Sequence, residues 1–299
     1  MAKSKQRKFY VVSIIVSFIL SVLLSIGGYL VGADMGIFNK DTIYKSMSAA
    51  GYYNGIYEDV VSTSKQLGRP MMLHAEVFEN VFYYNEVKDD MQNNLEAQLA
   101  GTMYTPDTSQ IRERLNSNIE DYARKNNIEI GTQQQTAIDG FLTQIEDNYK
   151  SSLGITFINY YVSMRKMFDN IYFKVLAAIL VLIMIAVFII IKDHRYVHRA
   201  IRYITYSTLA AAYMTGIIPM YLYIKGIYRR LAISPAYYYN MLIKTADKSL
   251  LMFVYISIFF LVLSAGLIAL TIILKNNLKK KASHSHTHHS HHSHHEAEE

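Results

Sequence analysis

FYVVSIIVSFILSVLLSIGGYLVGA, residues Phe9–Ala33, is a long apolar run near the start of this 299-residue chain. About 20 such residues in an α-helix cross the hydrocarbon core of a membrane. Three further runs also lack Asp, Glu, Lys, Arg and His: Val175–Ile191, Tyr203–Ile224 and Leu250–Leu274. Tyr172–Lys174 can extend the shortest of them into the interface. The sequence therefore predicts an integral membrane protein with four helical spans.

A polar stretch, residues 34–171, separates the first span from the second. It contains 19 acidic and 12 basic side chains, a net charge of −7. Its apolar residues recur at three- and four-residue steps, which is typical of amphipathic helices. The stretch is long enough for a domain of its own.

The first half of the polar stretch carries two predicted helices. Asp41 is suited to cap the first, and Pro70 suits the first turn of the second, which Gly101 ends. Their apolar faces are Ile43, Met47, Ala50, Tyr53, Ile56 and Val60, and then Val77, Val81, Tyr84, Val87, Met91, Leu95 and Leu99.

The second half carries two more. Asp107 with Gln110, and Thr132 with Gln135, are spaced as capping pairs. The apolar faces that follow are Ile111, Leu115, Ile119 and Tyr122, and then Ile138, Phe141, Leu142, Ile145 and Tyr149, with a break across residues 126–131. A final segment, residues 155–170, continues into the second span. Helices of these lengths predict an antiparallel bundle.

Basic clusters at the ends of the spans predict the orientation. Lys and Arg beside span ends stay on the cytoplasmic side of a membrane. If every run crosses, the three clusters share one side; they are Lys3, Lys5, Arg7 and Lys8, then Lys192, Arg195, Arg199 and Arg202, then Lys275, Lys279, Lys280 and Lys281. Both termini are then cytoplasmic, and residues 34–171 lie outside.

The predicted fold class is all-α: a four-span transmembrane helix bundle with an extracytoplasmic antiparallel helical bundle inserted between spans 1 and 2. In residue numbers, we expect a cytoplasmic N-terminus at 1–8, spans at 9–33, 172–192, 203–224 and 250–274, the helical domain at 34–171, a cytoplasmic loop at 193–202, an interfacial loop at 225–249 and a cytoplasmic tail at 275–299.

The loop at residues 225–249 is basic although this topology places it outside. One interpretation is an interfacial segment, with Tyr237–Tyr239 in the aromatic belt of the membrane. A second is a site for anionic lipid or a cell-wall polyanion, and a third is that the third run does not cross. The candidate residues for lipid or polyanion binding are Lys225, Arg229, Arg230, Lys244 and Lys248.

Small residues line one face of the first span. They are Ser13, Ser17, Ser21 and Ser25 at four-residue spacing, continued by Gly28 and Gly32. Small side chains let another helix approach closely, so this face packs either against a neighbouring span or against a second protein. The third span is also rich in small and hydroxyl residues. We expect the first and third spans at the centre of the bundle and the fourth in contact with lipid.

No motif in the chain predicts catalysis. Cysteine is absent, which excludes disulfides and thiolate chemistry. His74 is the one histidine of the polar stretch and is interpreted as a packed or surface residue. The acidic pairs Asp89–Asp90 and Glu120–Asp121 point in different directions on a helix and are interpreted as solvated. Spans without charged residues also argue against a proton-coupled transporter or ion pump.

The C-terminal tail is rich in histidine: His284, His286, His288, His289, His291, His292, His294 and His295. Clustered imidazoles bind Zn or Ni readily, although a flexible tail cannot select one metal. Adventitious binding, a regulatory metal site and a purification tag remain open. His194 and His198 are spaced to join such a site, or belong to the basic interface. We expect no resident cofactor.

Four segments carry a resemblance: Gly68-Arg69-Pro70, Val77-Phe78-Glu79-Asn80-Val81, Val87-Lys88-Asp89-Asp90-Met91 and Asp107-Thr108-Ser109. They resemble uncharacterised Gram-positive membrane proteins that have several spans and a helical extracytoplasmic segment. The resemblance covers the polar stretch and the spans, and implies no activity. A composition rich in Tyr, Ile, Asn and Lys and without Trp is also typical of an AT-rich bacterial genome.

The predicted function is that of a non-enzymatic, multi-pass protein of the bacterial plasma membrane. Its helical domain is expected to bind an envelope partner or ligand, and its spans to dock to another membrane component. The alternatives are an accessory subunit of a transporter or a metal-linked membrane protein that uses the histidine tail, and a sensor that signals through a partner. The expected partners are membrane lipids, a membrane or envelope protein and a second copy of the chain, with no nucleic acid.

Overall fold

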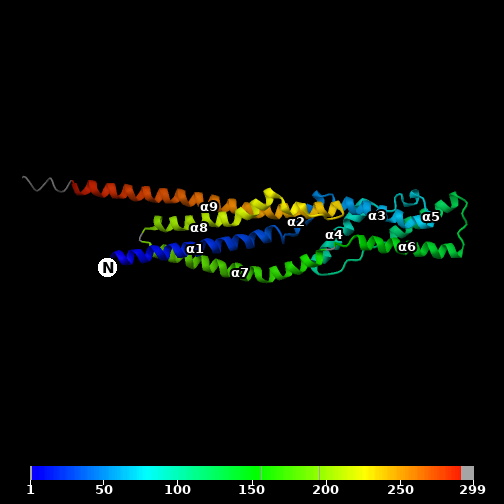
Figure 1. Ribbon diagram of the computed structural model, residues 1–299, viewed down its shortest axis with the longest axis horizontal. Coiled ribbons are helices and arrows are strands. Elements are labelled where there is room, and N and C mark those ends of the chain that lie inside the picture. The colour runs from blue at the N-terminus through cyan, green and yellow to red at the C-terminus, as the bar shows by residue number, and fades with distance from the viewer. Residues whose placement is uncertain (1, 156, 195, 291–299) are drawn as a thin grey trace, which may run out of the picture. The chain divides into compact units, whose positions relative to one another are not determined.

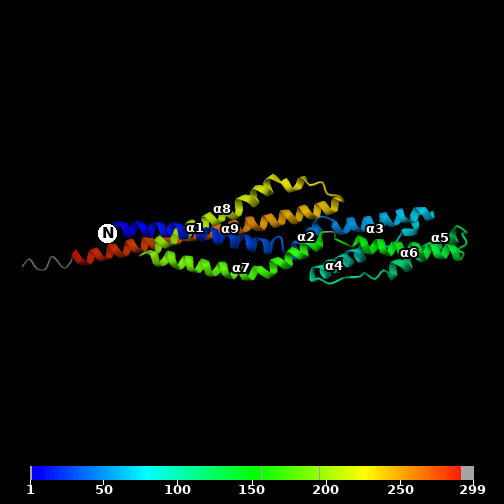
Figure 2. The ribbon, with the colours of Figure 1, turned by 60° about the horizontal axis from the view of Figure 1, so that its bottom comes forward.

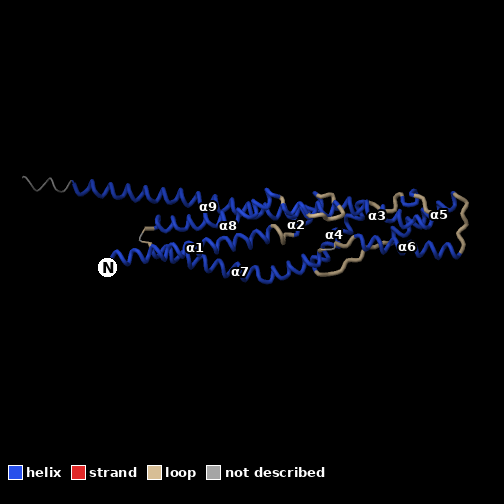
Figure 3. The backbone as a smooth tube through the Cα atoms, viewed as in Figure 1, coloured by secondary structure: helices blue, strands red, loops and turns tan. Residues whose placement is uncertain are grey.

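The computed structural model describes residues 2–155, 157–194 and 196–290, with side chains between residues 11 and 277. Throughout these residues the backbone forms helices, turns and loops and no strand, as Figure 3 shows. The all-α prediction is confirmed.

Figure 1 labels the helices in chain order. They are α1 (Ala2–Met35), α2 (Lys40–Ala49), α3 (Tyr52–Gly68), α4 (Tyr84–Ala100), α5 (Ser109–Lys125), α6 (Thr132–Ser152), α7 (Ile158–Asp193), α8 (Val197–Lys225) and α9 (Ala236–Ser290), with short 3₁₀ turns at Arg69–Met71, Ala75–Phe78 and Ile227–Arg230.

Among the described residues, four helical segments are long and apolar enough to cross a membrane: Val11–Met35, Ile158–Asp193, Val197–Arg230 and Ala236–Asn277. Each overlaps one predicted span. In α8, 39% of the most apolar window is buried, against 17% in both α7 and α9. The third span therefore lies among its neighbours, whereas α7 and α9 expose most of their apolar surface.

The chain forms two compact units. One, here called the span unit, contains Met1–Thr42, Asn170–Arg230 and Thr245–Glu299. The other, here called the helical domain, contains Ile43–Asp169 and Leu231–Lys244. Helices α7 and α9 each contribute residues to both units. The helical domain thus includes a segment that lies far from residues 34–171 in the sequence.

Gly51 breaks the first predicted helix of the helical domain into α2 and α3. Its φ is +67°, a left-handed conformation that glycine adopts without the steric cost of a Cβ. The apolar positions from Ile43 to Val60 still reach one core, since Met47 and Val60 are both fully buried. The periodicity was correct, but the prediction of one continuous helix was wrong.

The second predicted helix begins later than expected. Pro70 lies in a 3₁₀ turn, and α4 starts only at Tyr84. The backbone between them is irregular, with positive φ at Met72 and Asn80. This geometry buries the adjacent residues Val77 and Phe78 together, which one face of a regular helix would not do. The other expected boundaries hold closely: α4 ends before Gly101, α5 and α6 flank residues 126–131, and α7 begins at Ile158.

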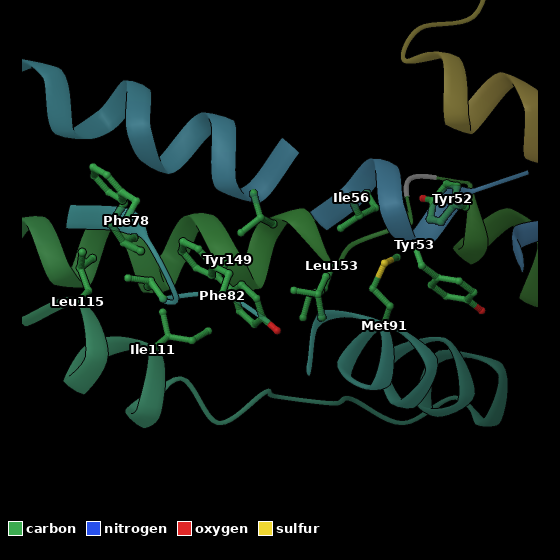
Figure 4. Packing of buried hydrophobic residues seen from close by; sticks show 14 of the residues in the cluster. Tyr52, Tyr53, Ile56, Phe78, Phe82, Met91, Ile111, Leu115, Tyr149 and Leu153 are labelled. Carbon is green, nitrogen blue, oxygen red and sulfur yellow. The ribbon is translucent and has the colours of Figure 1, made fainter. Parts of the chain in front are cut away.

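The core of the helical domain combines every helix of that unit. Figure 4 shows Phe78, Phe82, Ile111, Leu115 and Tyr149 packed between their ribbons. Burying a Leu or Phe side chain contributes about 1.5–3 kcal/mol. Leu115 and Tyr149 are completely inaccessible to solvent. This core, rather than the individual helices, stabilises the unit.

Ion pairs reinforce the same packing at its edge. The Arg114 guanidinium donates to both carboxylate oxygens of Glu86, at 2.9 and 2.6 Å, and through Nε to the Val81 carbonyl at 2.9 Å. Arg112 donates to Glu146 at 2.9 Å. These pairs join α5 to α4 and α6. They are partly exposed, so each contributes modestly to stability.

Candidate functional site

The small-residue face of α1 packs within the span unit. Ser13, Ser17, Ser21 and Ser25 are all buried. The Ser17 and Ser207 hydroxyls are 2.8 Å apart, and Ser207 donates to the Ser17 carbonyl at 2.7 Å. Figures 1 and 2 both show α1 beside α8. The face is therefore occupied by a helix of the same chain.

The two glycines continue this contact. A Cβ on Gly28 would lie 2.9 Å from Thr215 Cγ2 in α8, and one on Gly32 would lie 2.6 Å from Phe253 Cε1 in α9. Carbon atoms pack at about 3.5–4.0 Å, so neither position has room for a side chain. Glycine here permits α8 and α9 to approach α1.

The five basic residues predicted for lipid or polyanion binding are divided between the two units. Lys244 belongs to the helical domain, whereas Lys225, Arg229, Arg230 and Lys248 belong to the span unit. Arg229 donates to Asp247 Oδ1 at 2.8 Å, and the Tyr228 hydroxyl donates to the same oxygen. Much of the charge of Arg229 is therefore already balanced.

The predicted interfacial loop is largely helical, because α9 begins at Ala236 and continues through residue 249. Its first turns pack on α3 inside the helical domain. The Tyr237 ring meets Tyr52 edge to face, at 5.3 Å between ring centroids, and its hydroxyl donates to Asp59 Oδ2 at 2.6 Å. Met241, four residues later, is 1% exposed. We call this contact of Tyr237, Tyr238 and Met241 with the helical domain the α9 clasp.

The clasp gives two of the three tyrosines contacts within the helical domain. Tyr237 and Tyr238 contact Tyr52, and Tyr238 also contacts Phe157. Gly55 makes the approach possible, since a Cβ there would lie 2.7 Å from Tyr237 Cβ and closer still to its ring. Sequence spacing gives no sign of a contact between residues so far apart in the chain.

Asp90, one member of the acidic pair Asp89–Asp90, is a structural acceptor. Its carboxylate accepts hydrogen bonds from the Tyr104 hydroxyl at 2.6 Å and the Tyr149 hydroxyl at 2.5 Å. Burial raises the pKa of Tyr149, and the bonded Asp90 carboxylate raises it further. Both tyrosines therefore stay neutral donors, and the group has the chemistry of a packing contact. His74 stacks on Tyr122, with ring centroids 5.7 Å apart.

The histidine tail lies beyond the described side chains. His284, His286, His288 and His289 fall in the last turns of α9, where only the backbone is described, and His291, His292, His294 and His295 lie outside the described residues. Within the described side chains, no three His, Asp or Glu residues come close enough to hold a metal ion. A metal site on the tail remains a prediction.

Exposed apolar side chains of the helical domain recur at helical spacing on α7, where they form a stripe. Tyr160 is 79% exposed, Met164 60% and Met167 69%. Steps of four and three residues place these side chains on one helix face. The span unit exposes a similar stripe on its own part of α7, at Val181, Ile185 and Phe188. The spacing is visible in the sequence, but the exposure is not.

Comparison with protein-family models, with curated proteins and with solved structures finds no match to this chain.

Proposed function

We propose that this protein is a non-enzymatic, multi-pass protein of a bacterial plasma membrane, and that it binds another membrane protein along α7. The stripe Tyr160, Met164 and Met167 is the observation that carries the proposal. Large apolar side chains that are arranged at helical spacing and left uncovered by the rest of the chain are typical of a surface that a partner covers.

The orientation follows from charge. The basic clusters beside the ends of the four apolar helices favour cytoplasmic termini and an external helical domain. In this topology the partner contacts the stripe of Tyr160, Met164 and Met167 in the helical domain.

The occupant of the stripe is best matched by a helix of a second membrane protein. Steps of three and four residues present anchors to a parallel or antiparallel helix, as in helix-in-groove recognition. The apolar part of α7 is exposed over most of its length, so a transmembrane helix can continue the same contact.

Single cysteines test the topology, because the natural chain has none. Met103→Cys lies in the helical domain at a fully exposed position, and Asn277→Cys lies past the fourth apolar run. In intact cells, a membrane-impermeant maleimide should label Met103→Cys alone, and Asn277→Cys only after permeabilisation. The reverse pattern would overturn the orientation.

A photo-crosslinker on Met164→Cys tests the partner surface in native membranes. Ser117→Cys, an exposed position on α5, is the matched control. We expect an adduct with another membrane protein from residue 164 and none from residue 117. If neither residue 164 nor residue 117 gives a crosslinked adduct, partner binding along α7 is contradicted. An adduct of twice the chain's 34.3 kDa mass would identify a second copy as the occupant and contradict the assignment to a different protein.

A further inference from the structure

A pocket lies in the span unit, between α1 and the beginning of α8. Its volume is about 820 Å³. Basic side chains line the end near the start of α8, here called the opening, and serine, tyrosine and apolar side chains line the rest, here called the inner part.

The charge of the pocket is positive. Arg199, Arg202 and Lys275 line it, and no Asp or Glu does. No described carboxylate lies within ion-pair distance of these three cations. The nearby Asp193 already accepts a hydrogen bond from Ser13 at 2.5 Å. An anion that enters the pocket therefore meets three cations without displacing an existing ion pair.

A further feature favours an anion. His198 and Arg199 lie in the first turn of α8, whose N-cap Tyr196 provides no side-chain cap. The dipole of a helix N-terminus attracts negative charge.

The size of the pocket selects among anions. Arg199 and Ala210 both line it, and eleven helical steps place them about 16 Å apart along the axis. An inorganic phosphate ion fills only a small part of that length. The inner end, at Phe18, Ser21 and Ala210, is far less charged than the opening. A charged head followed by an apolar chain matches this gradient.

We propose that this pocket binds the phosphate of an anionic phospholipid from the surrounding membrane. Arg199, Arg202 and Lys275 contact the phosphate, and the lipid's first carbons lie toward Ala210. The inner wall is already organised, because Ser17 donates to the Tyr203 carbonyl at 3.0 Å and Ser207 to the Ser17 carbonyl at 2.7 Å. The site is separate from the α7 surface of the proposed function.

Lipid titration of the full-length protein tests the site. The protein is purified in a neutral detergent, and affinity is taken from the rise in melting temperature with short-chain phosphatidylglycerol, short-chain phosphatidylcholine or inorganic phosphate. Wild-type protein should bind phosphatidylglycerol most tightly. The variant R199Q/R202Q/K275Q should lose about fivefold in affinity per cation, hence about a hundredfold in all.

The matched control is R69Q/K125Q/K150Q, three exposed cations of the helical domain, which removes the same charge away from the pocket and should bind as the wild type does. An unchanged affinity in the pocket variant, or an equal loss in the control, would overturn the site. Ala210→Leu fills the inner end and keeps every cation. It should weaken phosphatidylglycerol binding, and unchanged binding would contradict the lipid position. If inorganic phosphate binds as tightly as phosphatidylglycerol, the pocket is a site for a soluble anion and the lipid proposal is wrong.

Discussion

Gly55→Ala should open the α9 clasp. The new methyl group would lie 2.7 Å from Tyr237 Cβ, an atom fixed to the backbone of α9 that cannot rotate away. Either α3 and α9 separate, or the Tyr237 ring leaves its position and loses its hydrogen bond to Asp59. Both outcomes weaken the attachment of residues 236–244 to the helical domain.

The size of the effect follows from the cost of overpacking. An extra methyl group at a packed contact costs about 2 kcal/mol. The helix preference of alanine over glycine stabilises α3 equally with the clasp open or closed, so it leaves the opening equilibrium unchanged. The net destabilisation of the clasp is therefore about 2 kcal/mol, a factor of about 30 in its opening equilibrium.

The assay uses a single cysteine at Met241, which is 1% exposed in the clasp. A maleimide reaches this position only when α9 detaches, so the labelling rate reports the opening equilibrium. Met241→Cys is the common background for every variant. Gly55→Ala should raise the labelling rate about 30-fold.

The decisive control removes the clash. In a Tyr237→Gly background neither the Cβ nor the ring of residue 237 is present, so the methyl group of Gly55→Ala has no Tyr237 atom to meet. There Gly55→Ala should leave the labelling rate nearly unchanged. If Gly55→Ala slows labelling, or leaves it unchanged, while Tyr237 is present, the clasp is not packed as described and the reasoning fails.

Two further predictions concern the other packed surfaces. Gly32→Ala should destabilise the full-length protein by about 1–3 kcal/mol and lower its melting temperature, because the new methyl group meets Phe253. Gly266→Ala should leave the melting temperature unchanged, because a Cβ there has open space. Equal melting temperatures for the two variants would contradict the contact with Phe253. The Ser109 N–H donates a hydrogen bond to the Asp107 carboxylate at 2.9 Å, and this bond lowers the pKa of that carboxyl group. The stability that the bond contributes is complete above the unfolded-state pKa of about 4 and is lost as the pH falls through the lower pKa of the folded state. The melting temperature should therefore fall between pH 7 and pH 2, and it should fall less in Asp107→Asn than in the wild type. Identical pH profiles for the two proteins would refute this role.

The sequence predicted the spans because the signal is local. A run of about 20 residues without charge meets the length and the solvation requirement of a membrane helix by itself. Residues 9–33 and 250–274 need no knowledge of their neighbours. The helical repeat of the polar stretch is equally local, so the buried positions from Ile43 to Tyr149 could be read before the core was known.

Helix boundaries inside the helical domain were harder to predict from the sequence. The repeat continues through Gly51, and only the φ of +67° reveals that the chain turns there. Pro70 is a good first-turn residue, yet the burial of Val77 and Phe78 against other helices outweighs that preference. Where two local signals compete, packing in the core decides.

Contacts between distant residues were decided by tertiary structure alone. Tyr237 meets Asp59 across 178 positions, and Ser17 meets Ser207 across 190. The lining of the basic pocket likewise combines α1, the start of α8 and Lys275 of α9. Hydropathy and periodicity describe one helix at a time. They identify which residues are buried or solvated, and they contain no information on which helix lies opposite, because that depends on the shape of the assembled side chains.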